Sequence, residues 1–181
     1  DGEFPAVSVT LKAESSAVPS YTGVVAIEEN GYQGVETLTD VPVLVRLGPD
    51  TEGFSYSTMA FPETGADLRF MDWDEKNVLP YEIDEWHNGG ESLVWVKLPE
   101  LKKGTRFKMF YGGSAVSSMN ETTHRMGYRG EAVWSDYAGV WHMNEDSGTA
   151  YDSTANRLDA LPESSSSTID EMVSNAAGAC G

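Results

Sequence analysis

Four short runs decide the fold of this chain: ADLRFMDWD at 66–74, LPYEIDEW at 79–86, SLVWVKLP at 92–99 and RFKMFYGG at 106–113. Each run is rich in aromatic or β-branched residues and is bounded by Gly, Pro, Asn or Asp. Such runs at close spacing predict an all-β domain, an antiparallel β-sandwich of jelly-roll-like kind. Alternation within the last run places Phe107, Met109 and Tyr111 on one face of their strand.

Further strand candidates precede this stretch. The strongest is VPVLVRL at 41–47, in which Pro42 belongs near the strand start or on a sheet edge because it lacks an N–H donor. Weaker candidates lie at 7–12 and 24–27, and the dipeptide Asn30-Gly31 supplies a turn after the second of them. No part of the chain shows sustained helical periodicity.

The composition limits the classes of function. The 181 residues carry a formal net charge of −17, with a pI of about 4.3, and this charge argues against a nucleic-acid partner. Cys180 is the only cysteine, so the chain has no internal disulfide. No apolar run reaches the roughly 18–20 residues of a membrane helix, so no insertion into a membrane is expected. An acidic, cysteine-poor surface is compatible with an extracellular or cell-surface module.

The character of the sequence changes near residue 131. The pieces Val133-Trp134 and 140–143 are predicted to be short strands, and a run of four serines follows at 164–167. The expected organisation is a β-sandwich domain at 1–130 and an incomplete or tail-like second β segment at 131–181.

Two resemblances support this division. The first part resembles the DUF2341 family, a domain of unknown function, over about residues 41–113. The pieces that carry the resemblance are PVLVRL at 42–47, GADLRF at 65–70, LPYEI at 79–83, Trp86, WVKLP at 95–99 and YGG at 111–113. Residues 133–156 resemble the opening of a concanavalin/laminin-G-like jelly roll, a fold common in large exported proteins concerned with surface attachment or polysaccharide use. The first family has no established activity, so the resemblance implies a fold and a location.

The second segment is too short for a complete jelly roll, which needs about eight strands. The chain is therefore a piece of a longer protein, or its tail completes the first domain, or another chain supplies the missing strands. In the last case, unpaired backbone groups at open sheet edges would direct assembly into a dimer or filament.

Carboxylates gather on the run at 81–86. Glu82 and Asp84 share one face at i, i+2 spacing, about 6.5–7 Å apart, which falls within the separation of a glycosidase pair. An acidic solvated face or a buried Glu82 paired with Arg69 explains the same pattern without catalysis, so no catalytic residue is assigned. Asp67 and Asp72 are expected on the neighbouring strand.

Oxygen ligands for calcium occur in two clusters. Asp72 and Asp74 belong to the first, and Asn144, Asp146 and Asp152 to the second. Neither cluster has the spacing of an EF-hand loop, and an exposed acidic turn is the competing explanation for each.

Tryptophans offer a binding surface, because an exposed indole face complements the C–H face of a sugar ring. Trp73 and Trp86 lie beside charged residues at predicted strand ends, whereas Trp95 between Val94 and Val96 is expected in the core. With Glu82 and Asp84, these two tryptophans form the predicted ligand site. We expect an exported, non-catalytic module for glycan binding, adhesion or surface assembly. The alternatives are an accessory module of a polysaccharide-degrading enzyme and a structural subunit of an extracellular filament.

Overall fold

The computed structural model describes residues 9–13, 21, 23–29, 32, 34–113, 126–128 and 130–161. The chain divides into two compact units, which we call unit 1 (Asp1–Val133) and unit 2 (Trp134–Gly181). Cys180, the serine run and the turn at Asn30-Gly31 lie outside the described residues. Among the described residues, no helix is long and apolar enough to cross a bilayer.

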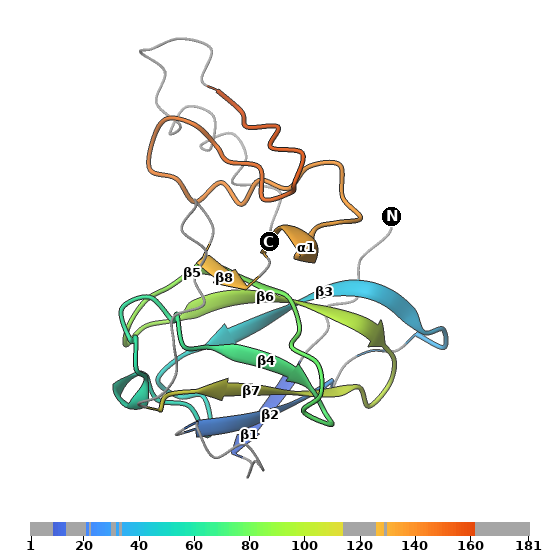
Figure 1. Ribbon diagram of the computed structural model, residues 1–181, viewed down its shortest axis with the longest axis vertical. Helices are drawn as coiled ribbons and strands as arrows, with labels where there is room; N and C mark the ends of the chain where they lie inside the picture. The colour runs from blue at the N-terminus through green and yellow to red at the C-terminus, as the bar shows by residue number, and fades with distance from the viewer. Residues whose placement is uncertain are drawn as a thin grey trace. The chain divides into compact units, whose positions relative to one another are not determined.

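Unit 1 is built from two four-stranded antiparallel sheets, which lie face to face (Figure 1). Sheet A has the order β1-β2-β7-β4 and sheet B the order β3-β6-β5-β8. The strands of sheet A are β1 (Val9–Ala13), β2 (Gly23–Glu29), β7 (Arg106–Tyr111) and β4 (Arg69–Asp72). The strands of sheet B are β3 (Leu38–Leu47), β6 (Ser92–Leu101), β5 (Tyr81–Glu85) and β8 (Met126–Tyr128). The predicted all-β sandwich is therefore confirmed.

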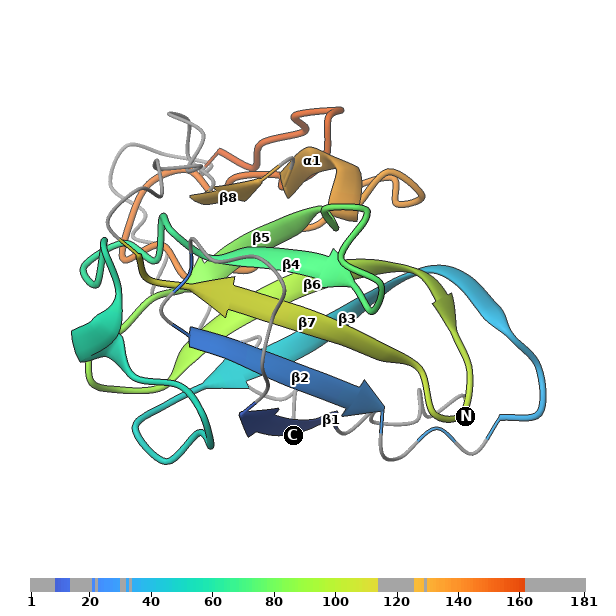
Figure 2. The ribbon, with the colours of Figure 1, turned by 60° about the horizontal axis from the view of Figure 1, so that its bottom comes forward.

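Within the residues that the structure describes, two short helices accompany the sheets. The 3₁₀ helix η1 (Tyr56–Thr58) lies in the connection between β3 and β4, and α1 (Gly130–Val133) ends unit 1 and packs on β5 and β6. In Figure 2 the strands of sheet A lie in front of those of sheet B. The long connection around η1 carries Phe54, Tyr56 and Met59 into the core, so hydrophobic packing anchors this loop.

The core lies between the sheets and follows the predicted alternation. Val25 faces Met109 across β2 and β7, and Tyr81 faces Val96 across β5 and β6. Phe107, Met109 and Tyr111 are all buried, as their shared face requires. Burial of side chains of this size stabilises the sandwich by roughly 1.5–3 kcal/mol each.

The pairing of the strands differs from the prediction in one respect. Asp67 and Asp72 were expected beside the strand of Glu82, but β4 pairs with β7 in sheet A, whereas β5 pairs with β6 and β8 in sheet B. The connection at 73–80 thus crosses from one sheet to the other. The alternation of apolar and polar residues shows which face of a strand is buried, but it does not show which strand pairs with it.

Unit 2 contains no strand within residues 134–161, so the predicted strand pieces at Val133-Trp134 and 140–143 are wrong. Val133 ends helix α1, and only isolated bridges join Trp141 to Asp152 and Ala150 to Ala160. Carboxylates, and not a β ladder, satisfy much of this backbone. Val140, Tyr151 and Leu158 each donate their N–H to an acidic side chain.

Candidate functional site

An open pocket of about 470 Å³ lies at one end of the unit 1 sandwich. The connection after β4, the end of β6 and the turn before β7 form its walls. Its lining is Asp72, Trp73, Leu79, Leu98, Pro99, Glu100, Lys102, Gly104, Thr105, Arg106 and Phe107. The volume falls within the range of small-molecule sites. We call it the Trp73 pocket.

A tight turn after β4 positions Trp73. The Asp72 carboxylate accepts hydrogen bonds from the Lys76 N–H (2.7 Å) and from the Asn77 side-chain amide (2.6 Å). Glu75 adopts a left-handed conformation with φ of 60°, which closes the turn. Burial raises the pKa of Asp72, but these hydrogen bonds outweigh it, and the net pKa is lowered. The carboxylate therefore stays charged and keeps the turn in place.

Two cations contact the indole ring of Trp73. The Arg106 guanidinium carbon lies 4.0 Å from the ring centroid and the Lys108 ammonium lies 4.7 Å from it. Lys108 also donates to the Glu75 carboxylate at 2.6 Å, and both of these side chains are nearly buried. Cation–π contacts of this kind contribute roughly 0.5–2 kcal/mol each, so Trp73 is held between the turn and β7.

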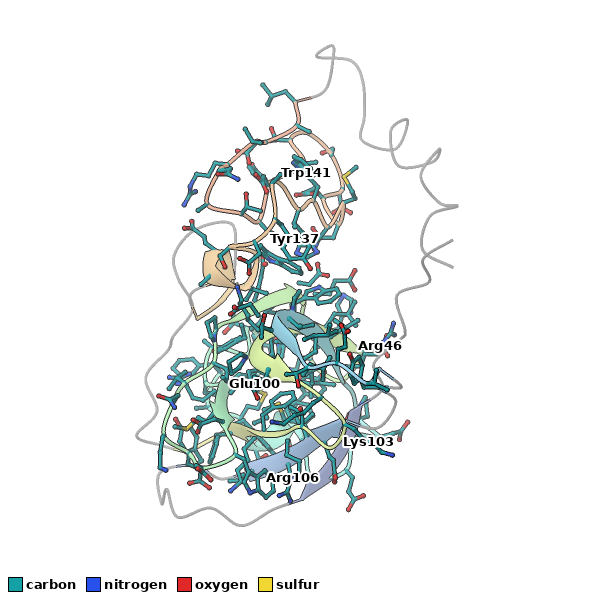
Figure 3. All side chains as sticks on the ribbon, turned by 90° about the vertical axis from the view of Figure 1, so that its right-hand side faces the viewer. Arg46, Glu100, Lys103, Arg106, Tyr137 and Trp141 are labelled. Carbon is teal, nitrogen blue, oxygen red and sulfur yellow. The ribbon has the colours of Figure 1, made fainter. Side chains whose placement is uncertain are left out.

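The β6–β7 turn forms the opposite wall of the pocket. Lys102 and Thr105 close it, because the Lys102 N–H donates to the Thr105 hydroxyl at 2.9 Å. Glu100 and Arg106 flank this turn and Lys103 lies within it (Figure 3). Lys102 pairs with Glu100 at 3.1 Å. The rim thus carries charged groups, whereas Leu79, Leu98 and Phe107 supply an apolar floor.

The predicted ligand residues Glu82 and Asp84 lie elsewhere. Glu82 alternates with the core residues Tyr81 and Ile83 and is itself 2% exposed, so it is on the outer face of sheet B and buried. Asp84 accepts a hydrogen bond from the Trp95 indole at 3.2 Å. Neither carboxylate lines the Trp73 pocket. Trp95 is only partly buried and does not belong to the core cluster, contrary to its expected position.

The buried Glu82 was expected to pair with Arg69. Its burial is confirmed, and the pairing stays a prediction. Arg69 belongs to β4 in sheet A and donates to the carbonyl oxygens of Ala66 (3.1 Å) and Leu68. The Arg69 side chain also bonds to the Tyr81 hydroxyl, whose pKa is raised by burial.

Trp86 packs against the core. Its indole N–H donates to the Pro62 carbonyl at 2.8 Å, and its ring meets Tyr56 edge-on at a centroid distance of 5.4 Å. A second open pocket of about 480 Å³ lies near η1, but Trp86 does not line it. Of the four predicted ligand residues, Trp73 alone therefore lines the Trp73 pocket.

Gly65 makes room for the Trp86 ring. Its φ is +65°, and a Cβ atom there would lie 2.8 Å from the ring. Gly65→Ala is therefore expected to lower the free energy of unfolding by about 2–3 kcal/mol, from backbone strain plus the overlap. Gly89→Ala is the matched control, because Gly89 also has a positive φ but has nothing within 4 Å. For this control, urea denaturation should show a loss of about 1 kcal/mol in the free energy of unfolding. Equal losses in both variants would contradict the packing of Trp86 against Gly65.

Three of the five predicted calcium ligands, Asp72, Asp74 and Asp152, are engaged within the chain. Asp72 is bonded as described, and Asp74 lies 3.4 Å from the Lys76 ammonium. In unit 2, Asn144 and Asp146 are exposed, whereas Asp152 is fully buried. Over the described residues, no group of three or more His, Cys, Asp or Glu side chains is arranged to hold a metal ion. Calcium binding stays a prediction of the sequence.

Asp152 organises the backbone of unit 2. Its carboxylate accepts the N–H groups of Val140 (2.9 Å), Thr154 (2.9 Å) and Leu158 (2.9 Å), and also the Thr154 hydroxyl (2.8 Å). Burial would raise the pKa of Asp152, but these hydrogen bonds prevail and lower the pKa to about 2. The role of Asp152 within the chain is therefore to join three backbone segments.

Comparison of the sequence with models of protein families gives one match. The family described as "Domain of unknown function (DUF2341)" matches residues 64–155, slightly more than half of the chain. The chain belongs to this family. The match begins later than the resemblance at 41–113 and reaches residue 155, so it includes most of the segment compared with laminin-G-like jelly rolls. That second resemblance is not confirmed by a family match. No curated protein and no solved structure matches the chain.

Two of the DUF2341 motifs seen in the sequence, GADLRF and YGG, meet around one carboxylate. Asp67, in GADLRF, is fully buried and accepts the N–H groups of Ala60 (3.1 Å), Phe61 (2.9 Å) and Gly112 (2.6 Å). Gly112 belongs to the YGG run that follows β7. Tyr81, in LPYEI, donates its hydroxyl to the Leu68 carbonyl at 2.6 Å and so ties sheet B to sheet A. Asp67, Gly112 and Tyr81 therefore have a structural role and do not line the Trp73 pocket, whereas Leu79 of LPYEI and Leu98 and Pro99 of WVKLP do line it.

Sequence reasoning missed Arg106 as a site residue. The alternation of RFKMFY does put Arg106 and Lys108 opposite the core-facing side chains, and this was the available signal. Their contact with Trp73 depends on the pairing of β4 with β7, which the local pattern does not contain.

Proposed function

We propose that this DUF2341 domain is a non-catalytic glycan-binding module of an exported protein and that the Trp73 pocket is its binding site. The observation that carries the proposal is the composition of this pocket: an indole ring, an apolar floor and charged side chains at the rim. Sugar rings present both C–H faces and hydroxyl groups, so they match such a mixed lining. An extracellular or cell-surface location supplies this class of ligand.

The distribution of carboxylates favours binding over hydrolysis. A glycosidase needs two carboxyl groups flanking one bond, and Glu82 and Asp84 do not line the pocket. Its two acidic residues, Asp72 and Glu100, each have a partner: Asp72 holds the turn, and Glu100 pairs with Lys102. The same pocket would serve an accessory module of a polysaccharide-degrading enzyme, which is the alternative proposal.

Trp73→Ala is expected to weaken glycan binding by at least about tenfold, because it removes the ring and the support of Arg106. Isothermal titration of the full chain with a panel of neutral and acidic oligosaccharides would measure the loss. Trp141→Ala is the control, since Trp141 is an exposed tryptophan of unit 2 outside the pocket (Figure 3). Binding that survives Trp73→Ala unchanged would remove the pocket as the site, and a wild-type chain that binds no glycan would remove the proposed function.

Self-assembly remains a second candidate function. β1 and β4 are the terminal strands of sheet A, and β3 and β8 are those of sheet B. The β3 strand is ten residues long, and Pro42 within it lacks an N–H group, which limits strand addition there. Sedimentation over a range of concentrations would show whether the chain associates.

A further inference from the structure

We propose that the Trp73 pocket selects a carboxylated sugar, a uronic-acid unit, and that Arg106 is the residue that binds its carboxylate. This inference rests on the proposed glycan-binding function and adds to it the chemical class of the ligand. The observation that carries it is that Arg106 lines the pocket without an ion pair. The chain around it is strongly acidic, with 29 Asp and Glu residues and 12 Lys and Arg residues.

Most described cations have a carboxylate partner. Ion pairs join Arg46 to Glu91, Lys76 to Asp74, Lys97 to Asp40, Lys102 to Glu100 and Lys108 to Glu75. Within the part of the chain that the structure describes, Arg106 forms no ion pair, and its guanidinium contacts the ring of Trp73. Glu28 is the cross-strand neighbour of Arg106 in the β2–β7 pairing, but no ion pair joins them, so the guanidinium is directed to Trp73 and not to the adjacent carboxylate.

The contact with Trp73 leaves the binding edge of Arg106 usable. A guanidinium contacts an aromatic ring through its face, and its five N–H donors lie in the plane of the group. Two parallel N–H donors match the two oxygens of a carboxylate, and the paired bonds are short and directional. Held at 4.0 Å from the ring, Arg106 is ordered before a ligand arrives, which lowers the entropic cost of binding.

The other charged groups in and beside the pocket do not compete for this role. Of the lining residues, Glu100 lies 3.1 Å from Lys102, and beside the pocket Glu75 pairs with Lys108 at 2.6 Å. Asp72 accepts hydrogen bonds from the turn at Lys76 and Asn77. Among the residues that line the pocket, Arg106 is therefore the cation without a carboxylate partner, and it lies against the Trp73 ring. The net charge of −17 disfavours anions elsewhere on the protein, so an acidic glycan would bind where a cation is locally unpaired.

The test compares an oligogalacturonate with the same oligosaccharide after chemical reduction of its carboxyl groups, by isothermal titration of the full chain. We expect the acidic form to bind at least about tenfold more tightly than the reduced form. Arg106→Gln should abolish this preference, so that this variant binds the acidic and the reduced forms with affinities within about twofold of each other. Arg106→Lys should recover only part of it, because an ammonium group lacks the bidentate geometry.

Lys103→Gln is the matched control. It removes the same charge from the β6–β7 turn, but Lys103 does not line the pocket. Equal losses in Lys103→Gln and Arg106→Gln would reduce the effect to general electrostatics and overturn the inference. Equal binding of the acidic and reduced forms would also overturn it and would leave the glycan-binding function standing.

A sulfated oligosaccharide that binds as tightly as the uronate would overturn the assignment of a carboxylate. Failure of both the acidic and the reduced forms to bind, while another glycan of the panel binds, would again overturn the inference alone. If no glycan binds, the proposed function fails and the inference fails with it.

Discussion

Asp67→Ala is expected to lower the free energy of unfolding of unit 1 by about 4 kcal/mol, the largest effect of any single substitution considered. The carboxylate is fully buried and accepts three backbone N–H groups, those of Ala60, Phe61 and Gly112. Alanine would leave these donors without an acceptor, and each buried donor that loses its partner costs about 1–3 kcal/mol. Water that enters the space left by the side chain would accept some of these hydrogen bonds, so the total loss is smaller than the summed cost of three unpaired donors.

Urea denaturation followed by tryptophan fluorescence would measure this loss. Asp50→Ala is the matched control, because Asp50 is an exposed aspartate in the turn after β3 and should change stability by less than about 0.5 kcal/mol. Asp67→Asn should fall between the two, since its single oxygen can serve only part of the donor set. A loss below about 1 kcal/mol for Asp67→Ala would show that these bonds do not organise the family motif.

The strands of unit 1 were predictable because their signal is local. Val43, Val45 and Leu47 alternate with partly exposed residues, and the structure buries these three on one face of β3. The pairing of strands was not predictable in the same way. The chain crosses from sheet A to sheet B between Asp72 and Tyr81, and the residues of this crossing do not record which strand lies beside them.

In the candidate site, too, residues with a local sequence signal were predictable, whereas those that depend on contacts far along the chain were not. Asp72 and Trp73 were chosen from the sequence, and both line the pocket. Trp86 has the same local signature, an indole beside charged residues, but Gly65 and Tyr56 cover its ring. The difference arises from contacts 21 and 30 residues away in the sequence, which no local pattern distinguishes. Arg106 was missed for the same reason. It contacts Trp73 because β7 pairs with β4, and this pairing is not visible in the local sequence.

Unit 2 shows how a sequence of strand-like composition can fold differently. Val140 and Trp141 are good strand formers, but the N–H of Val140 donates to the Asp152 carboxylate, so a side chain takes the place of a neighbouring strand. Acidic residues that looked like calcium ligands thus serve as backbone acceptors. Asp159 and Glu145 act in the same way toward the N–H groups of Asp152 and Tyr151.

Asp152→Ala is accordingly expected to open unit 2 while leaving unit 1 folded. The substitution removes the acceptor of three backbone N–H groups and one hydroxyl. Since hydrogen bonds to a charged group contribute about 1.5–3 kcal/mol each, amide protection at Val140, Thr154 and Leu158 should fall about a hundredfold or more. Hydrogen exchange followed by NMR would measure this residue by residue. Asp146→Ala is the control, because Asp146 is exposed.

The same carboxylate predicts a pH dependence with a definite sign. The folded pKa of Asp152 is about 2, below the value of 3.8 expected when the chain is unfolded. A lowered folded pKa means that the ionised carboxylate stabilises unit 2 fully above pH 3.8 and that this contribution is lost as the pH falls through about 2. Protection of the Val140, Thr154 and Leu158 amides should therefore decrease across this window in the wild-type chain and be insensitive to it in Asp152→Asn. A wild-type profile that stays flat from pH 4 to pH 2 would mean that Asp152 is not the group that joins these segments.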